Sequence, residues 1–446
     1  MSSEPMNFIN KPLGDCLELV IDHRGKTPRK LKSDWVSDGI PTISAKNVNS
    51  GKLVAHNAIR YVTHDIYKKW MPVDVARGDC FLVSEGATLG HCLYWDEPYR
   101  IVLGQRIFCL RSNPEVLYSR YLYAYMNSVN FQSEIIGRST GSSVAGLRQT
   151  EVLKLNIKLP SMSVQKTIGD TLYYLNKKTE SNTQTNQTLE EMTQAIFKSW
   201  FVDFDPVKAK IRGEQPEGMD AATAALFPNK LVESELGLIP EGWDIKSIKD
   251  FGKVITGNTP PKKVEGAYSQ AGVPFITPTD IDNDTFVTET KRFLSESGME
   301  VMKKNLLPEG SICITCIGSQ MGKAVIAPSA SISNQQINSI VTKNSYERNF
   351  LFLNLRRRRK EIFLIGSSGS TMPIINKSTF EKLKIVSPTE YLLKVFDEAM
   401  SPLLDKIHQN SLENQTLSAL RDTLLPKLLS GEIAVDKDII PSEVEL

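Results

Sequence analysis

Two stretches of the chain carry a seam of apolar and small polar residues that are spaced alternately four and three positions apart. This spacing is typical of a helix that packs along one face against another helix. In the first stretch the seam consists of Ile168, Leu172, Leu175, Thr179, Asn182, Asn186, Leu189, Thr193, Ile196 and Trp200. In the second it consists of Phe396, Met400, Leu403, Ile407, Asn410, Asn414, Leu417, Arg421, Leu424 and Leu428. The pattern predicts two long helices, at residues 161–202 and 389–431.

Prolines interrupt only the second seam. Pro402 lies inside it, so we expect a kink there or a new helix start capped by Ser401. Pro426 and the pair Ser430-Gly431 are expected to mark the end of this helix.

Both seams carry two asparagines near their middle. If the helices pair antiparallel, these four side chains face one another, and a buried asparagine fixes register at a cost in stability. The candidate register residues are Asn182, Asn186, Asn410 and Asn414. The alternative is that they point to solvent where the helices unwind locally. Two short seams in one chain most simply pair with each other, which predicts an intramolecular antiparallel coiled coil with a globular domain at each end.

The chain also repeats itself. The tetrapeptide Asn-Gln-Thr-Leu occurs at 186–189 and again at 414–417. Gly25-Lys-Thr-Pro28 matches Gly257-Asn-Thr-Pro260, and the loop 86–90 matches 318–322 with glycine at both ends. The Ser/Gly-rich stretches at 139–143 and 367–371 also correspond. Several matches in the same order indicate a pseudo-twofold internal repeat of one unit.

The segments outside the seams are of mixed α/β (α+β) character, at residues 1–160 and 241–388. Strand-like runs separated by turn residues are Ile40–Ile43, Cys80–Val83, Ile107–Leu110, Ile312–Ile317 and Ile337–Val341. One helical stretch is expected in each segment, at about 116–136 and 346–364. Residues 203–240 hold Gly, Pro and an excess of acids and are interpreted as a linker, and 432–446 as a C-terminal tail.

Composition narrows the class of protein. Of the 446 residues, 41% are hydrophobic and 23% charged, which is typical of a soluble globular protein. We expect no membrane span and no secretory signal. Six scattered cysteines favour a reducing cytoplasm over a disulfide scaffold. The net charge of +2 means that a nucleic-acid binder would have to concentrate its positive charge locally.

Motifs for catalysis or metal binding are incomplete. The loop ending in Lys323 resembles a phosphate-binding loop but is one residue short, and no Ser or Thr follows the lysine. Cys313 and Cys316, alone in a predicted strand, favour packing over zinc binding. We therefore expect no catalytic residue, no metal and no cofactor in this chain.

The repeated loops are rich in side chains that can read base edges or bind phosphates. In the first half the candidate DNA-binding residues are Arg24, Lys26, Thr27, Arg29, Lys30, Lys46, Asn47, Glu85, Thr88, Gln105 and Arg106. In the second half they are Asn258, Thr259, Lys262, Lys263, Thr279, Asp280, Ser319, Gln320, Lys323, Gln335 and Gln336. For any single residue an ordinary polar loop is the simpler explanation. As a set, they suggest one framework that carries two different reading surfaces.

The basic run Arg356–Lys360 lies on the predicted helix of the second half. It could follow phosphates, contact a partner or form a solvated face, and the last interpretation is slightly favoured.

Three longer motifs carry a resemblance to a known family. They are Asn186–Pro206 (NQTLEEMTQAIFKSWFVDFDP), Leu236–Trp243 (LGLIPEGW) and Leu424–Gly431 (LLPKLLSG). With them, nearly the whole chain resembles the specificity subunit of a Type I DNA restriction-modification system. The resemblance implies two target recognition domains that each read one part of a split, asymmetric DNA sequence. It also implies that the coiled coil sets the spacer and docks the partners.

The partners implied are double-stranded DNA, two modification (methyltransferase) subunits and, through the complex, the restriction (motor and nuclease) subunits. S-adenosylmethionine, ATP and Mg would be cofactors of those subunits. Trp200 and Phe201 are predicted to serve the intersubunit interface or the domain junction. A different class, a coiled-coil scaffold whose globular ends bind protein or carbohydrate, stays open, as does a fused or single-partner modification system.

Overall fold

The computed structural model describes residues 7–49, 51–141, 144–367 and 373–433, which form two compact units. The first unit combines the chain up to Thr179 with the chain from Thr416 onward, and the second spans Glu180–Gln415. The tail predicted from 432 lies outside the described residues from 434 on, as do parts of both Ser/Gly-rich loops.

A four-stranded antiparallel sheet forms the centre of the first unit. Its order is β2-β10-β7-β8, with β2 at Leu17–Asp22, β10 at Ile107–Ser112, β7 at Cys80–Val83 and β8 at Cys92–Tyr94. Side chains alternate between two cores along β7: Leu82 packs towards the core that includes Phe131, whereas Phe81 packs towards the core that includes Trp70. An apolar run such as Cys-Phe-Leu-Val is therefore buried on both faces.

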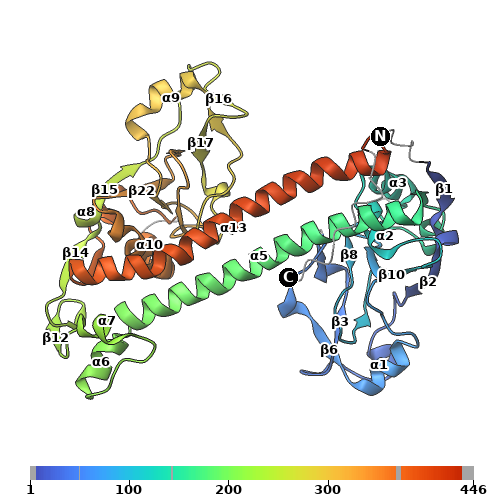
Figure 1. Ribbon diagram of the computed structural model, residues 1–446, viewed down its shortest axis with the longest axis horizontal. Coiled ribbons are helices and arrows are strands. Elements are labelled where there is room, and N and C mark those ends of the chain that lie inside the picture. The colour runs from blue at the N-terminus through green and yellow to red at the C-terminus, as the bar shows by residue number, and fades with distance from the viewer. Residues whose placement is uncertain (1–6, 50, 142–143, 368–372, 434–446) are drawn as a thin grey trace. The chain divides into compact units, whose positions relative to one another are not determined.

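The remaining elements of the first unit cover this sheet (Figure 1). A small second sheet has the order β6-β3-β9, at Arg60–Val62, Ile40–Ile43 and Val102–Leu103. A hairpin joins β4 at Val48–Asn49 to β5 at Lys52–Leu53. The helices are α1 at His64–Trp70, α2 at Ser119–Met126, α3 at Val129–Arg138 and α4 at Gln149–Val152. The first strand, β1 at Ile9–Pro12, pairs with the last, β11 at Asn156–Leu159.

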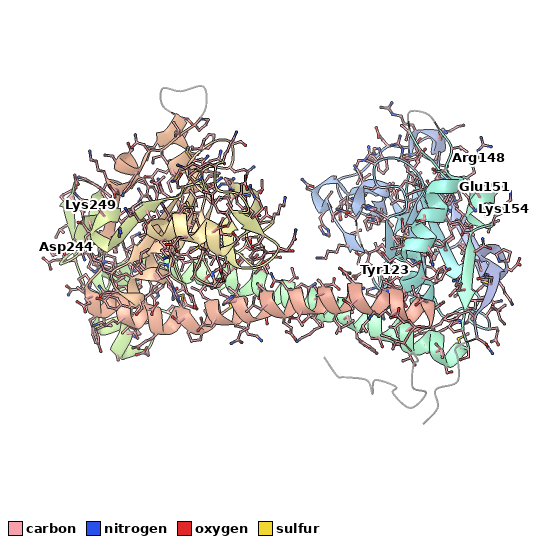
Figure 2. All side chains as sticks on the ribbon, turned by 90° about the horizontal axis from the view of Figure 1, so that it is seen from above. Tyr123, Arg148, Glu151, Lys154, Asp244 and Lys249 are labelled. Carbon is pink, nitrogen blue, oxygen red and sulfur yellow. The ribbon has the colours of Figure 1, made fainter. Side chains whose placement is uncertain are left out.

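The second unit repeats this topology. Its main sheet has the order β15-β22-β19-β20, at Gly252–Thr256, Ile337–Thr342, Ile312–Thr315 and Ala324–Ile326. Its second sheet has the order β16-β18-β17-β21, at Tyr268–Ser269, Phe293–Leu294, Val273–Ile276 and Ile332–Ser333. The helices are α8 at Ile248–Phe251, α9 at Glu296–Met302, α10 at Arg348–Arg357, α11 at Arg359–Ser367 and α12 at Lys377–Glu381. Strand β14 at Asp244–Ser247, whose Asp244 is labelled in Figure 2, pairs with β23 at Lys384–Ser387. The predicted internal repeat is thus present in the fold.

The two predicted long helices are α5, at Met162–Phe201, and α13, at Glu390–Ser430. The new helix start expected at Pro402 is wrong, because α13 continues through it, and the alternative of a kink there stays a prediction. Pro402 is exposed, while Met400 and Leu404 beside it are buried in the core of the second unit. This packing outweighs the local cost of a proline. The hydroxyl of Ser401 accepts a hydrogen bond from Asn349 at 3.0 Å instead of capping a helix.

Each predicted single helix in the domains is two helices. In the first unit, α2 and α3 are separated at Ser128. The hydroxyl of Ser128 accepts a hydrogen bond from the N–H of Phe131 at 3.2 Å and so caps the start of α3. In the second, α10 and α11 meet at Arg358.

The interpretation of residues 203–240 as a linker is also wrong. The segment folds into α6 at Asp205–Ile211, α7 at Ala221–Ala225 and a hairpin of β12 at Leu231–Ser234 with β13 at Gly237–Pro240. Val207 and Phe227 are buried in the main core of the second unit. Apolar residues of the segment pack against aromatic residues outside it, as Phe227 does against Trp200, and local composition does not reveal these contacts.

In the second unit, α5 and α13 run antiparallel and bury their seams against each other (Figure 1). Asn182 Nδ2 donates to Asn414 Oδ1 at 3.0 Å, and Asn410 Nδ2 donates to Asn186 Oδ1 at 2.9 Å. The asparagines therefore face one another across the helix pair. In the first unit, Leu172 of α5 packs in one core with Leu428 of α13.

Within the described residues, none of the helices has the length and apolar character needed to cross a membrane. In the same part of the chain, no cluster of three or more His, Cys, Asp or Glu has a geometry that could hold a metal ion. Cys313 and Cys316 are buried in two different cores, and burial raises the pKa of Cys313 to about 11 and that of Cys316 to about 12.

Candidate nucleic-acid interface

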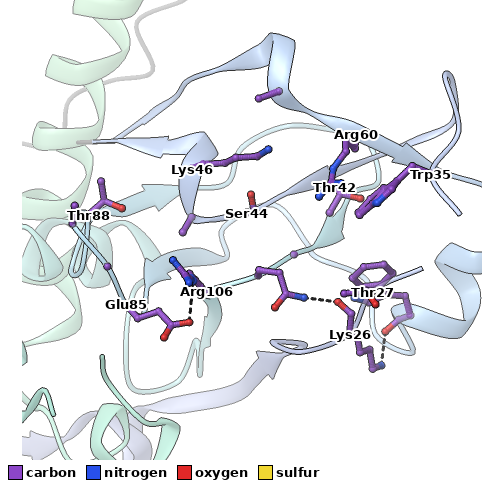
Figure 3. Close-up of a pocket in the computed structure, with 17 residues that line it drawn as sticks. Lys26, Thr27, Trp35, Thr42, Ser44, Lys46, Arg60, Glu85, Thr88 and Arg106 are labelled. Carbon is purple, nitrogen blue, oxygen red and sulfur yellow. Dashed lines mark hydrogen bonds and ion pairs between the residues drawn. The ribbon is translucent and has the colours of Figure 1, made fainter. Parts of the chain in front are cut away.

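A cavity of about 490 Å³ opens in the first unit where four loops converge (Figure 3). The loops are the Gly-Lys-Thr-Pro loop, the turn after β3, the loop between β7 and β8, and the turn before β10. Seven of the predicted contact residues line it: Lys26, Thr27, Lys46, Glu85, Thr88, Gln105 and Arg106. The structure therefore gathers side chains that are up to eighty positions apart in the sequence.

Gln105 ties the Gly-Lys-Thr-Pro loop to the sheet. Its Oε1 accepts from the N–H of Gly25 at 2.9 Å, and its Nε2 donates to the carbonyl oxygen of Lys26. Lys26 Nζ donates to the carbonyl oxygen of Trp70 at 2.8 Å. These bonds hold the loop in place and leave the side chain of Thr27 at the cavity.

Glu85 and Arg106 form an exposed pair at the cavity. Arg106 Nε lies 3.3 Å from Glu85 Oε1, and 57% of the Arg106 side chain is exposed. Arg106 adopts a left-handed φ of 62°, which is unusual for a side chain of this size. Its carbonyl oxygen accepts from the N–H of Ser84 at 2.9 Å, so the strained turn continues the pairing of the central strands β7 and β10.

Two of the predicted contact residues serve the fold instead. Asn47 is fully buried: its Oδ1 accepts from the N–H of Ser44 at 3.1 Å, and its Nδ2 donates to the carbonyl oxygen of Ala55 at 3.3 Å. The prediction that Asn47 contacts DNA is therefore wrong. Arg24 makes two hydrogen bonds to Asp22, at 2.9 and 2.8 Å, and stacks 4.0 Å from the centre of the Phe108 ring. Its guanidinium is already satisfied within the domain.

Arg29 and Lys30 are exposed on a short 3₁₀ helix beside the same loop. Lys30 Nζ donates to the carbonyl oxygen of Gly25 at 2.6 Å. Neither residue lines the cavity.

The second unit joins its loops in the same manner. The hydroxyl of Thr259 donates to Gln335 Oε1 at 2.6 Å, and the N–H of Asn258 donates to the carbonyl oxygen of Ser333 at 2.9 Å. Gln335 thus occupies the role of Gln105 and links the Gly-Asn-Thr-Pro loop to the turn before β22. The exposed residues of these loops are Asn258, Thr259, Lys262, Lys263, Thr279, Ser319, Gln320 and Gln335.

Three candidates of the second unit are engaged in internal bonds. Asp280 accepts from the N–H and the hydroxyl of Thr277, at 2.8 and 2.6 Å, and so repeats the capping role of Asn47. Lys323 Nζ donates to the carbonyl oxygen of Ile281 at 3.2 Å, and only 12% of its side chain is exposed. The N–H of the half-buried Gln336 donates to Asn334 Oδ1 at 3.0 Å.

The loops between β7 and β8 and between β19 and β20 need their glycines. Gly86 and Gly90 have φ of 96° and 85°, and Gly318 and Gly322 have φ of 81° and 84°. Only glycine adopts this left-handed region readily. The repeated spacing of glycines therefore specifies two hairpins of the same shape with different residues between the glycines.

Sequence reasoning missed two pairs of side chains beside these loops. In the first unit, Arg60 stacks 3.9 Å from the centre of the Trp35 ring, and both residues line the cavity. In the second, Arg292 lies 5.2 Å from the centre of the Tyr268 ring. Arg60 and Arg292 are 232 positions apart, as are Gly25 and Gly257, so aligning the repeats further would have found them.

The family model described as Type I restriction modification DNA specificity domain matches residues 5–191 and 240–420. The chain belongs to this family. A curated relative in Haemophilus influenzae, the Type I restriction enzyme HindI specificity subunit, is 32% identical over 80% of this chain and 87% of its own length. The MjaIX specificity subunit of Methanocaldococcus jannaschii is 27% identical over 93% of this chain and 91% of its own.

Among solved structures, the S subunit of a Type I restriction-modification system from M. genitalium aligns over 95% of this chain and 96% of its own, with a TM-score of 0.65. At 14% identity it shows that the fold is shared. Each specificity domain of this chain thus has a long helix as part of its matched region.

The basic run of the second specificity domain is only partly solvated. Arg357 and Lys360 are exposed, as the favoured interpretation predicts, but that interpretation is wrong for Arg356. Arg356 Nη2 lies 3.0 Å from Glu190 Oε2 on α5, and its Nη1 donates to Thr285 Oγ1 at 2.7 Å. It thereby connects α10 to α5 within the second unit.

Trp200 and Phe201 both pack in the core of the second unit. The ring centre of Trp200 lies 5.3 Å from that of Phe227, and Phe201 lies 4.8 Å from Phe396. These contacts support the domain-junction version of their predicted role, because they hold α5 against α13 and the folded 203–240 segment.

Proposed function

We propose that the chain is the DNA-recognition subunit of a Type I restriction-modification complex. It reads an asymmetric target in two parts, with one specificity domain for each half-site. The observation that carries the proposal is the duplicated arrangement of loops: Gln105 and Gln335 hold equivalent loops together, while the side chains those loops expose differ. One framework with two reading surfaces fits a split target whose halves are unrelated.

The pair of long helices acts as the spacer. Half-sites read from one face of the duplex lie about one helical turn, ~34 Å, apart. Joining two weak readers through a rigid spacer makes the second contact intramolecular, which raises affinity steeply. This also explains a net charge of only +2: the cations gather in a few loops, and large partners supply other phosphate contacts.

The partner subunits carry out the methylation and the restriction reactions. Two modification subunits dock on the helices and supply S-adenosylmethionine-dependent methylation, and restriction subunits that use ATP and Mg join through the complex. This chain selects the site and contributes no catalytic group. The complex acts in the cytoplasm, where the scattered thiols stay reduced.

A change in spacer length tests the proposal. Seven residues inserted into α5 after Thr179 and into α13 after Gln415 add two turns to each helix, or about 10 Å. We expect the methylated target to gain about three base pairs in its spacer, at 3.4 Å each, with both half-sites unchanged. The measurement is mapping of methylated adenines in cells that express the complete system. Altered half-sites with the original spacer would contradict the proposal.

Salt dependence separates this function from a coiled-coil scaffold that binds protein or carbohydrate. The assembled complex should lose affinity for duplex DNA steeply as salt rises. A complex that does not bind duplex DNA at low salt would favour the scaffold.

A further inference from the structure

Both specificity domains present an arginine that is stacked on an aromatic ring at an equivalent position. Arg60 begins β6, and its guanidinium carbon lies 3.9 Å from the centre of the Trp35 ring. Arg292 immediately precedes β18, the counterpart of β6, and lies 5.2 Å from the ring centre of Tyr268 and 5.3 Å from that of Phe275. The stacked arginine is therefore present in both domains, although the exposed side chains of their loops differ.

These two guanidinium groups have no acidic partner among the residues that the structure describes, although both side chains are exposed. Some other arginines of the same domains are neutralised: Arg111 lies 2.8 Å from Asp79, and Arg356 lies 3.0 Å from Glu190. Cation–π stacking restrains the plane of a guanidinium and leaves its N–H donors available. An arginine held in this way is prepared for an acceptor outside the chain.

Arg60 also lies where the predicted contact residues gather. It lines the cavity together with Lys26 and Gln105, and Figure 3 shows it beside Trp35 and Thr42, away from Glu85 and Thr88. Within the described chain, the hydroxyl of Thr42, a residue that is 7% exposed, has no hydrogen-bond partner. The arginine is therefore part of a concave surface that carries polar side chains and that no other described element of the domain fills.

We infer that Arg60 and Arg292 are specificity-determining residues that each read a guanine in the half-site of their own domain. A guanidinium donates two parallel N–H bonds to O6 and N7 of guanine in the major groove. The two bonds to guanine require a fixed orientation of the guanidinium plane. A phosphate, in contrast, binds a flexible cation almost as well as a restrained one. The inference rests on the proposed function, because it assumes that the domains bind DNA.

The experiment uses the complete modification complex with Arg60→Lys or Arg292→Lys in this chain. Each variant keeps the charge and loses the planar fork. Arg60→Lys should reduce discrimination at one G·C pair of one half-site by about 10- to 100-fold and leave the other half-site unchanged. Arg292→Lys should do the same in the other half-site. The readout is the consensus of methylated sites, together with binding to duplexes that carry each single substitution.

Matched controls are Arg77→Lys in the first domain and Arg357→Lys in the second. Arg77 is exposed but lies 3.4 Å from Asp96, and Arg357 is exposed on α10. Both variants should leave the consensus unchanged. A second probe is Trp35→Leu, which removes the stacking ring: it should weaken discrimination at the same base pair as Arg60→Lys, while Trp35→Phe should retain most of it.

The outcomes distinguish the inference from the proposed function. A wild-type complex that methylates no bipartite site would overturn the proposed function. A bipartite site with no G·C pair in one half, or Arg60→Lys and Arg292→Lys variants that weaken all targets equally, would overturn the inference alone. In the second case the arginines contact phosphates.

Discussion

Asn410 donates its side-chain amide to Asn186 Oδ1, 2.9 Å away, at the centre of the antiparallel helix pair in the second unit. Asn186 in turn donates to the carbonyl oxygen of Ile407 at 3.2 Å and to the hydroxyl of Ser411 at 3.1 Å. The seam thus contains amide groups whose hydrogen bonds across the helix pair depend on this alignment, although Asn410 Oδ1 accepts no hydrogen bond within the described chain. We propose that this alignment fixes the register of the helices.

Replacing one asparagine of this pair should lower the free energy of unfolding more than replacing both. In Asn186→Leu, the amide of Asn410, a residue that is 1% exposed, loses its acceptor, and we expect a loss of about 1–3 kcal/mol in the free energy of unfolding. In the double variant with Asn410→Leu the apolar side chains can pack, and stability should recover. Urea denaturation measures both. A double variant that is less stable than either single variant would contradict the argument.

Arg356→Met should destabilise the second unit. It removes the ion pair to Glu190 and the hydrogen bond to Thr285, a residue that is 1% exposed, and it leaves the Glu190 carboxylate half-buried without its cation. We expect a loss of about 1–3 kcal/mol in the free energy of unfolding. The matched variant Arg357→Met, on the exposed side of the same helix, should change it by less than about 0.5 kcal/mol.

Acid should weaken the contact between α13 and the 281–290 loop. The His408 ring stacks on Phe286 with centres 4.4 Å apart, and burial lowers the pKa of His408 in spite of the nearby Glu309 and Asp405. Between that lowered pKa and the unfolded value of about 6.5, the unfolded chain binds more protons, so stability rises with pH in this window. Stability should therefore fall on acidification below about pH 6.5, and His408→Gln should flatten this dependence in thermal unfolding. An unchanged pH profile in the variant would show that other groups cause it.

Gln105→Ala should release the Gly-Lys-Thr-Pro loop of the first domain. The variant loses the hydrogen bond that the N–H of Gly25 donates to Gln105 and the one that Gln105 donates to the carbonyl oxygen of Lys26. We expect the amide of Gly25 to exchange at least about tenfold faster in hydrogen-exchange mass spectrometry, because about 1.4 kcal/mol of protection corresponds to that factor. Gln335→Ala is the control: it should leave this peptide unchanged and loosen the loop around Thr259 instead.

Trp200→Ala should lower stability by about 3 kcal/mol through loss of packing against Phe227 and Phe396. Met192→Ala on the same helix, at a side chain that is 46% exposed, is the control and should change little. If Trp200→Ala folds and still assembles with the modification subunits, the interface version of its predicted role is wrong.

Much of the architecture follows from local pattern. The seams predict α5 and α13 to within one residue at each end, because heptad periodicity is written in consecutive turns of one helix. Repeated Gly-x-Thr-Pro and Gly-x-x-x-Gly loops identify two copies of one domain, and all four glycines of the Gly-x-x-x-Gly loops adopt backbone conformations that other residues avoid. The three longer motifs carry the resemblance to the family, and the match of the family model confirms it.

Only the tertiary structure decided which polar side chains stay available to bind a partner outside the chain. Asn47 and Gln105 are both amide side chains in predicted polar loops. Asn47 is fully buried as a cap, whereas Gln105 lies at the cavity and holds two loops together. Arg356 forms an ion pair with Glu190, while Arg60 stacks on Trp35 and its N–H donors stay available for a ligand. Pro402 stays helical for the same reason: contacts between residues far apart in the chain outweigh local preference, and no local pattern contains them.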